Sequence, residues 1–180
     1  MTMTLSIATI HSPLGPLKIA LSDRGICGLT FADGWATAES GFRRRFGPQV
    51  TFVSAINSSP ASTAVERYFA GELHALDELE LDTGGTEFQE RVWARLREVP
   101  SGETISYGQL AAAIGCPNAS RAVGHANATN PVCLVIPCHR VIQAGGKIGN
   151  YGGGVDRKEW LLHHETLHAR MTTHSPLIAG

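Results

Sequence analysis

The chain has 180 residues, of which 43% are hydrophobic and 17% charged, and its formal net charge is −1. This length allows one domain or two small ones, and the balanced charge excludes a global basic signature of nucleic-acid binding. No stretch approaches the roughly 20 apolar residues that span a bilayer, and the first residues lack the pattern of a signal peptide. We therefore expect a cytoplasmic protein whose four cysteines are free thiols.

The first part of the chain is typical of strands. Three short apolar runs separated by turn residues predict an antiparallel meander over residues 5–10, 17–22 and 26–31. Ser59 and Pro60 are a helix-start signal, and Gly71 is the matching stop. We expect an N-terminal domain over residues 1–83, where an acidic segment ends in two glycines.

Helices with clear start signals dominate the second part, over residues 84–169. Thr86 and Ser106 each begin a capping box, and Gly115 ends the helix that follows Ser106. Asn118 is expected to cap the next short helix, over residues 119–128. Two short helices joined by a tight glycine-containing turn make a helix-turn-helix candidate. The same spacing is also common between any two packed helices, so DNA binding is one of two interpretations.

The last third of the chain carries a short apolar run followed by a glycine-rich loop. Residues 132–136 are expected to form a strand that delivers Cys138, and the glycines lie within residues 145–154. Asp156 is expected to begin a third capping box and a last helix that reaches about Ala169. We expect residues 170–180 to be a flexible tail.

The candidate nucleophile is Cys138. A free thiol has a pKa near ~8.5, so it is mostly protonated at neutral pH and needs a neighbouring base. His139 is next in sequence, and Glu165 is an acid that could orient its imidazole, which follows the logic of a Ser-His-Asp triad. Adjacent side chains usually point apart, so a water is expected to bridge His139 and Cys138. The alternative is that Cys138 is simply a buried thiol.

Metal and phosphate sites are disfavoured. The glycine-rich loop fails the P-loop pattern because Ile148 follows Lys147, where that pattern needs Ser or Thr. Neither the spacing of Cys133 and Cys138 nor that of His164 and His168 matches a metal motif, and the two histidines are expected on a solvated helix face. We expect no metal and no cofactor.

Six motifs in order resemble the methylated-DNA–protein cysteine methyltransferase family, also called O6-alkylguanine-DNA alkyltransferases. They are residues 12–17 (SPLGPL), 86–93 (TEFQERVW), 102–110 (GETISYGQL), 120–124 (SRAVG), 130–131 (NP) and 136–141 (IPCHRV). The resemblance implies an α+β fold. A small N-terminal antiparallel-sheet domain with a helix, ribonuclease-H-like, would precede a mainly helical C-terminal domain with a helix-turn-helix.

The resemblance also implies roles for particular residues. Cys138 would accept an alkyl group from O6 of guanine, or from O4 of thymine, once per molecule. The remaining catalytic residues would be His139, Glu165, Tyr107 and Asn130. The substrate would lie against Val141, Tyr151, Gly152, Gly153 and Pro137. DNA would be bound by Arg121, Tyr107, Ser120, Ala119 and Asn127.

The implied partner is double-stranded DNA containing O6-alkylguanine, bound mainly through the minor groove after the base is flipped out. Arg121 would fill the space that the flipped base leaves in the stack. The resemblance implies a monomer without an obligate protein partner. Three rival classes stay open from the residues alone: a lesion-binding protein without repair activity, a cysteine hydrolase, and a transcription regulator.

Overall fold

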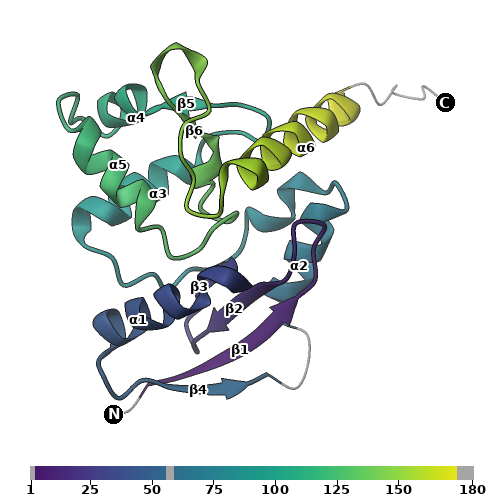
Figure 1. The fold of residues 1–180 in the computed structure, drawn as a ribbon, viewed down its shortest axis with the longest axis vertical. Coiled ribbons are helices and arrows are strands. Elements are labelled where there is room, and N and C mark those ends of the chain that lie inside the picture. The colour runs from purple at the N-terminus through teal and green to yellow at the C-terminus, as the bar shows by residue number, and fades with distance from the viewer. Residues whose placement is uncertain (1–2, 56–58, 174–180) are drawn as a thin grey trace.

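A computed structural model of the chain describes residues 3–55 and 59–173 (Figure 1). The first half forms a twisted sheet with helices packed against it, and the second half forms a mostly helical lobe above that sheet (Figure 1). No helix within the described residues is long and apolar enough to cross a membrane. The predicted α+β class and the sheet-then-helices organisation are confirmed.

The N-terminal sheet has the strand order β3-β2-β1-β4. Its strands are β1 (Thr4–Ile10), β2 (Leu17–Leu21), β3 (Ile26–Phe31) and β4 (Thr51–Ser54). The first three form the predicted antiparallel meander, with Ile7 opposite Ala20. However, β4 pairs parallel to β1, so the sheet is mixed and the expectation of a purely antiparallel sheet was wrong. A parallel neighbour needs a crossover connection, and a helix supplies it here.

That crossover helix is α1 (Trp35–Phe46), which follows a single 3-10 turn (η1, Ala32–Gly34). Neither α1 nor β4 was predicted from the sequence. Phe42 of α1 packs onto one face of the sheet, where a side chain at Gly28 would collide with its ring. Helix α2 (Pro60–Phe69) covers the opposite face, and its start is as predicted, because the Ser59 hydroxyl accepts the Ser62 amide.

The linker between the two halves runs along the sheet. After α2, Gly71 adopts a positive φ of 103° and a 3-10 turn follows (η2, Leu73–Leu76). The backbone at Glu80 and Asp82 then hydrogen-bonds to both sides of Ile26 on β3. These two hydrogen bonds therefore fix the start of the second half to β3, the edge strand of the N-terminal sheet.

The C-terminal lobe contains four α-helices and a two-stranded parallel ladder among its described residues. Its elements are α3 (Glu87–Arg97), β5 (Ile105–Ser106), α4 (Tyr107–Ala113), α5 (Ser120–Ala128), η3 (Cys138–Arg140), β6 (Val141–Ile142), η4 (Ala144–Gly146) and α6 (Val155–Thr173). The capping boxes at Thr86 and Ser106 are both present, as predicted. Helices α4 and α5 pack together through a turn with Gly115 at φ +77°, which is the predicted helix-turn-helix arrangement.

Two helix starts were predicted wrongly. Ala119, not Asn118, is the N-cap of α5, and it makes no side-chain cap. A turn in which the Ala119 amide bonds to the Cys116 carbonyl leads into α5 instead. Helix α6 begins at Val155 after Gly154, so Asp156 lies inside its first turn, where a negative charge favours the helix dipole.

The run at residues 132–136 is not a strand. Val132 makes one isolated bridge to Leu29, and the chain then turns through Leu134, which has a positive φ of 70°. The amides of Val135 and Ile136 bond back to Cys133 and Val132 within the same turn. The run is apolar because it is buried between the two halves, and burial alone does not distinguish a strand from a turn.

Helix α6 also continues beyond the predicted end at Ala169, as far as Thr173. The first residues of the predicted tail are therefore helical. The remainder of that tail, residues 174–180, lies outside the described residues.

Candidate active site

Cys138 lies at the start of η3, directly after the buried turn, and is 7% exposed. Burial raises the pKa of its thiol, while the nearby polar groups of Asn130 and Tyr151 and the positive charge of Lys158 act in the opposite direction. The net effect is a raised pKa, so the resting thiol holds its proton. A base is therefore needed before Cys138 can act as a nucleophile.

His139 is placed to be that base. Its ring is fully buried, and Nε2 lies 2.8 Å from Oε1 of Glu165. Because a carboxylate only accepts hydrogen bonds, Nε2 must carry the proton and Nδ1 of the neutral ring is left as an acceptor. Nδ1 has no hydrogen-bond partner among the described residues. No direct hydrogen bond joins His139 to Cys138, in keeping with the expectation that the two side chains do not meet directly.

Glu165 is a buried carboxylate surrounded by donors. Oε1 accepts from His139, from the Tyr68 hydroxyl at 2.8 Å and from Arg140 at 2.9 Å. Oε2 accepts from Nε of Arg140 at 2.9 Å and from the Gly102 amide at 3.2 Å. Burial alone would raise the pKa of Glu165, but His139 and then Arg140 hold it well below its usual value of 4.5. Glu165 therefore stays ionised and can stabilise a protonated His139.

Arg140 was not among the predicted site residues, although it lies within the signature run. Its guanidinium donates to Glu165, to the Val99 carbonyl and to the Ser101 hydroxyl. These bonds tie the helix α6 carboxylate to the end of α3. Arg140 therefore fixes the orientation of Glu165 and cannot itself reach the thiol.

Asn130 braces the turn that carries Cys138. Its Nδ2 donates to the Ile136 carbonyl at 2.8 Å, and its Oδ1 accepts the Val132 amide at 2.9 Å. Because Asn130 directly follows α5, it couples the helix-turn-helix to the catalytic turn. Pro137, which is buried, completes the approach to Cys138.

The wall beside the thiol comes from the glycine-rich loop. The Tyr151 hydroxyl is buried without a hydrogen bond of good geometry, and burial and then the Cys138 thiol raise its pKa well above the usual value. A side chain at Gly153 would come within 2.8 Å of the Tyr151 ring, whereas the space beside Gly152 is open. Of the loop residues predicted for the site, Tyr151 therefore lies near the thiol, and Gly153 packs against Tyr151.

Lys158 holds that loop in place, and no local sequence signal pointed to it. It is 1% exposed, and its Nζ donates to the carbonyls of Val141 and Ile148, both at 2.6 Å. Val141 itself is fully buried in β6, paired with Ile105. One ammonium group therefore joins the two segments on either side of the thiol.

Tyr107 is the first residue of α4, and its ring lies against Gly124 of α5. Burial raises the pKa of Tyr107 above its usual value, the side chain of Asn127 acts in the opposite direction, and Cys138 raises the pKa further. Asn127 is 8% exposed. The structure thus puts Asn127 in the interior beside Tyr107, not on the exposed face where a residue in direct contact with DNA would lie.

The exposed face of α5 carries Arg121. Its neighbours at the helix start, Ala119 and Ser120, are half-buried, and Val123 packs inward. His125 is exposed one turn beyond Arg121 on the same face of the helix. The helix-turn-helix therefore presents the cation of Arg121 at its surface, while the Tyr107 ring packs against Gly124 on the inner side of α5.

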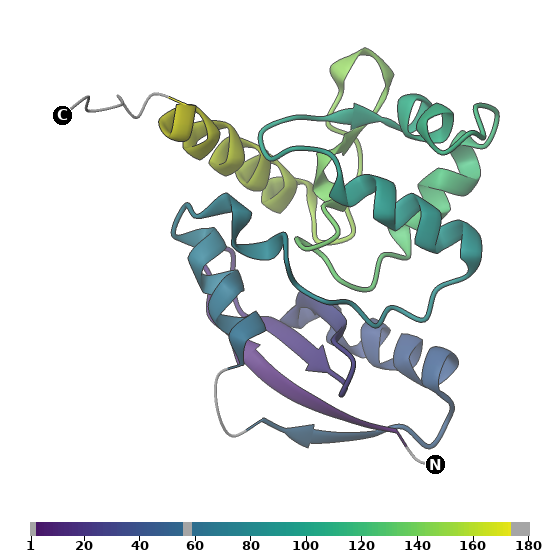
Figure 2. The same cartoon turned by 180° about the vertical axis from the view of Figure 1, so that it is seen from behind.

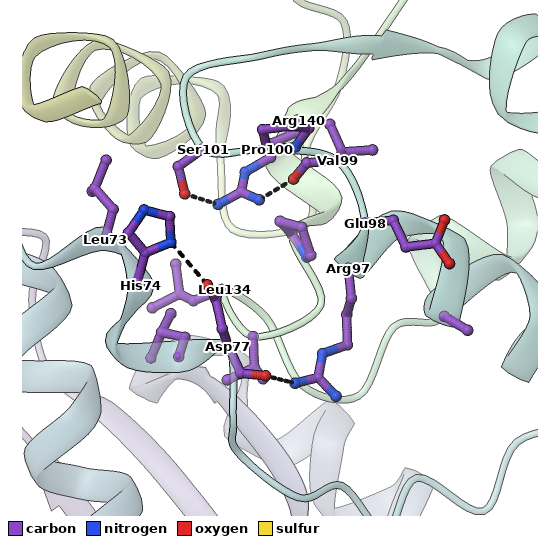
Figure 3. Close-up of a pocket in the computed structure, with 14 residues that line it drawn as sticks. Leu73, His74, Asp77, Arg97, Glu98, Val99, Pro100, Ser101, Leu134 and Arg140 are labelled. Carbon is purple, nitrogen blue, oxygen red and sulfur yellow. Dashed lines mark hydrogen bonds and ion pairs between the residues drawn. The ribbon is translucent and has the colours of Figure 1, made fainter. Parts of the chain in front are cut away.

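A pocket of about 470 Å³ lies between the two halves, behind the catalytic turn (Figure 3). Its lining includes Pro137 and Arg140 but not Cys138. Arg140 reaches into it toward Ser101, and Asp77 pairs with His74 (Figure 3). The polar side chains of this pocket thus hydrogen-bond to one another, and we interpret the pocket as a gap in the packing between the two halves.

The expectation that His164 and His168 lie on a solvated face of α6 was partly wrong. His164 is 5% exposed, and its Nε2 lies 2.9 Å from the Tyr68 carbonyl oxygen. Its ring stacks on Trp160 at 4.8 Å, because α2 of the first half packs against this side of α6. The described residues contain no group of three or more potential ligands that could hold a metal ion.

Both halves of the chain match domains of one known family. Residues 5–83 match the ribonuclease-like domain of 6-O-methylguanine DNA methyltransferase, and residues 87–167 match its DNA-binding domain. A solved structure of Mycobacterium tuberculosis OGT in complex with DNA superposes with a TM-score of 0.73 at 39% identity, covering 92% of this chain and 94% of that one. Fold and site together therefore define a DNA-repair protein.

Curated relatives carry the name methylated-DNA–protein-cysteine methyltransferase. That of Mycolicibacterium paratuberculosis is 45% identical over 162 residues, which are 89% of this chain and 92% of the relative. That of Salmonella typhimurium is 55% identical over 113 residues, 63% of this chain and 66% of the relative, slightly under two thirds. The chain belongs to the methylated-DNA–protein-cysteine methyltransferase family. The resemblance inferred from the motifs is confirmed.

Proposed function

We propose that the chain transfers one alkyl group from O6 of an alkylated guanine in duplex DNA to the thiol of Cys138, irreversibly and once per molecule. O4-alkylthymine is a second substrate of the same chemistry. The observation that carries the proposal is the buried His139–Glu165 pair, with Nδ1 of His139 free to accept a proton one residue from the thiol. The names of the relatives support the substrate class.

The transfer proceeds through a thiolate. The thiol proton passes by way of a bridging water to Nδ1 of His139, and Glu165 stabilises the imidazolium that forms. The thiolate then attacks the alkyl carbon, so that an S–C bond forms as the C–O6 bond breaks and its electron pair stays with guanine. Tyr107, whose raised pKa keeps it protonated until the transfer, then gives its proton to the departing base so that guanine leaves neutral, and the tyrosinate recovers a proton from solvent. The site offers nothing that would hydrolyse the thioether, which limits each molecule to one reaction.

The base is held by the backbone around the thiol. In this proposal, backbone groups at Cys138 and Val141 bind its exocyclic amine, and the Gly152 amide faces O6. The open space beside Gly152 leaves room for the base, and Tyr151 and Gly153 line the pocket. Pro137 shapes the opposite edge. Lys158 supports the arrangement because it fixes Val141 and the loop together.

A lesion inside the duplex must be rotated out before it can reach a thiol that is 7% exposed, which costs a few kcal/mol of pairing and stacking. We propose that α5 enters the minor groove and that Arg121 occupies the gap in the base stack. Ser120 and Ala119, at the start of α5, lie beside the phosphates, and Asn127 acts indirectly by holding Tyr107. Thiol chemistry of this kind needs a reducing compartment, which supports a cytoplasmic location. We propose that the protein acts there as a monomer.

The test is to incubate the protein with an oligonucleotide containing O6-methylguanine, and then to measure its intact mass and map the modified peptide. One added methyl group per molecule, located on Cys138, is the expected result. Cys133→Ser is the matched control, because it removes the neighbouring thiol and should still gain one methyl group. Repaired DNA with unmodified protein indicates a hydrolase, and binding without repair indicates a lesion-binding protein or a regulator; either result contradicts the proposal.

Arg121→Ala is expected to slow repair of duplex DNA about tenfold, the equivalent of roughly 1.4 kcal/mol of lost stabilisation of the extrahelical base. Transfer from free O6-benzylguanine should change little, because no base stack has to be opened. Rates on both substrates are compared by single-turnover assays. Arg95→Ala, which removes a cation from α3, is the control and should leave both rates near wild type. Equal losses on the two substrates would argue against a role of Arg121 in the stack.

A further inference from the structure

A side chain of the N-terminal half reaches the centre of the proposed relay. Tyr68, near the end of α2, is fully buried, and its hydroxyl donates to Oε1 of Glu165 at 2.8 Å. This is the same carboxylate oxygen that lies 2.8 Å from Nε2 of His139. Helix α2, in blue-teal, lies directly below the yellow α6 (Figure 2). The two residues are 97 positions apart in sequence, so only the packing of the two halves brings them together.

The Tyr68 hydroxyl has little freedom to point elsewhere. The Tyr68 carbonyl lies 2.9 Å from Nε2 of His164, one residue before Glu165 on α6. The Tyr68 ring meets the rings of Phe69 and His164 edge-on, with centroids 5.4 Å away in both cases. Burial, and then the charge of Glu165, raise the pKa of Tyr68 well above its usual value. The hydroxyl is therefore a permanent donor, held in one place.

A neutral donor at this position has a specific effect on proton transfer. Each hydrogen bond to the ionised form of a buried carboxylate lowers its affinity for a proton. With Tyr68 donating to Oε1, the proton is retained by the imidazole and does not pass to Glu165. A second cation at the position of Tyr68 would repel the imidazolium that the relay must form, whereas a tyrosine hydroxyl brings no net charge.

We propose that Tyr68 is a positioning residue for alkyl transfer, through which the N-terminal half holds Oε1 of Glu165 in line with His139 and sets the basicity of the relay. The inference rests on the proposed function, because it assigns a further participant to the same proton path. It also gives the ribonuclease-like half a part in the reaction, although none of its residues is placed at the thiol in the proposed mechanism.

Tyr68→Phe tests the proposal because it removes only the hydroxyl. Single-turnover methyl transfer is measured from pH 5.5 to 9, with the rate constant and the final extent recorded separately. We expect a roughly tenfold lower rate constant at the plateau, because Oε1 of Glu165 loses the hydrogen bond that holds it in line with His139. The midpoint of the acid limb should move to higher pH, because a carboxylate with one donor fewer stabilises the imidazolium more strongly. The extent should remain one methyl group per folded molecule.

Phe69→Leu is the matched control. Phe69 packs on Trp160 and His164 in the same contact between α2 and α6, but it does not touch Glu165. This variant should unfold at lower temperature while keeping the wild-type midpoint. A wild-type midpoint in Tyr68→Phe, or an equal shift in both variants, overturns the role of Tyr68. Failure of the wild-type protein to methylate Cys138 is a different result, and it would overturn the proposed function instead.

Discussion

Cys138→Ser is expected to reduce methyl transfer from O6-methylguanine DNA by at least about 10³-fold, the scale on which loss of a catalytic nucleophile is felt. A serine hydroxyl is far less acidic than a thiol, and no direct hydrogen bond joins His139 to residue 138, so almost no alkoxide would form to attack the alkyl carbon. The rate of methyl loss from a labelled duplex measures the effect. Binding to the same duplex should be retained, because α5 and its exposed Arg121 are unchanged.

The matched variant is Cys133→Ser, which removes a thiol that lies close to Cys138 in the same buried turn. Burial, and then the proximity of Cys138, raise the pKa of Cys133 well above the usual range, so Cys133 is poorly suited to be a nucleophile. The Cys133→Ser variant should therefore retain the wild-type extent of methyl transfer. If Cys138→Ser still gains a methyl group, or if Cys133→Ser loses the reaction, the acceptor has been assigned to the wrong residue.

Glu165→Gln is expected to slow transfer by about 10² to 10⁴-fold. The glutamine amide would bring N–H groups toward the donors of His139 and Arg140, and it cannot stabilise an imidazolium as a carboxylate does. DNA binding should change much less than the rate. The comparison of single-turnover rates with duplex affinity separates the two effects. Glu159→Gln, an exposed position on the same helix, is the control and should match wild type in both.

Glu165→Gln should also lower the free energy of unfolding at neutral pH by about 3–5 kcal/mol, because it leaves Arg140 buried without its ionic partner. The pKa of Glu165 is lower in the folded state than its usual value of 4.5, so its stabilising effect is present above about that pH and is lost as the pH falls. The difference in unfolding free energy between wild type and Glu165→Gln should therefore shrink below pH 4.5. Urea unfolding at several pH values measures it, and a difference that does not depend on pH would contradict the assignment.

Local signals in the sequence were sufficient where a structure depends on neighbouring residues. The capping boxes at Thr86 and Ser106 and the Ser59 cap each join groups three residues apart, so they can be read directly along the chain. Short apolar runs separated by turn residues likewise predicted the first three strands. By contrast, α1 escaped prediction, because polar and small residues fill it and only Phe42 is fully buried.

The proposed site divides in the same way. The motifs in the sequence by themselves determined the family, and they predicted the roles of Cys138, His139, Tyr107 and Arg121, which lie within them. Glu165 lies outside the motifs, and the resemblance to the family predicted its role. Only the tertiary structure decided how they are joined. Cys138 follows a buried turn and not a strand, Asn127 faces inward, and Tyr68, Arg140 and Lys158 complete the hydrogen bonds around the relay and the loop. The physical reason is that a buried charge must find partners, and their distance along the chain places no limit on where those partners come from.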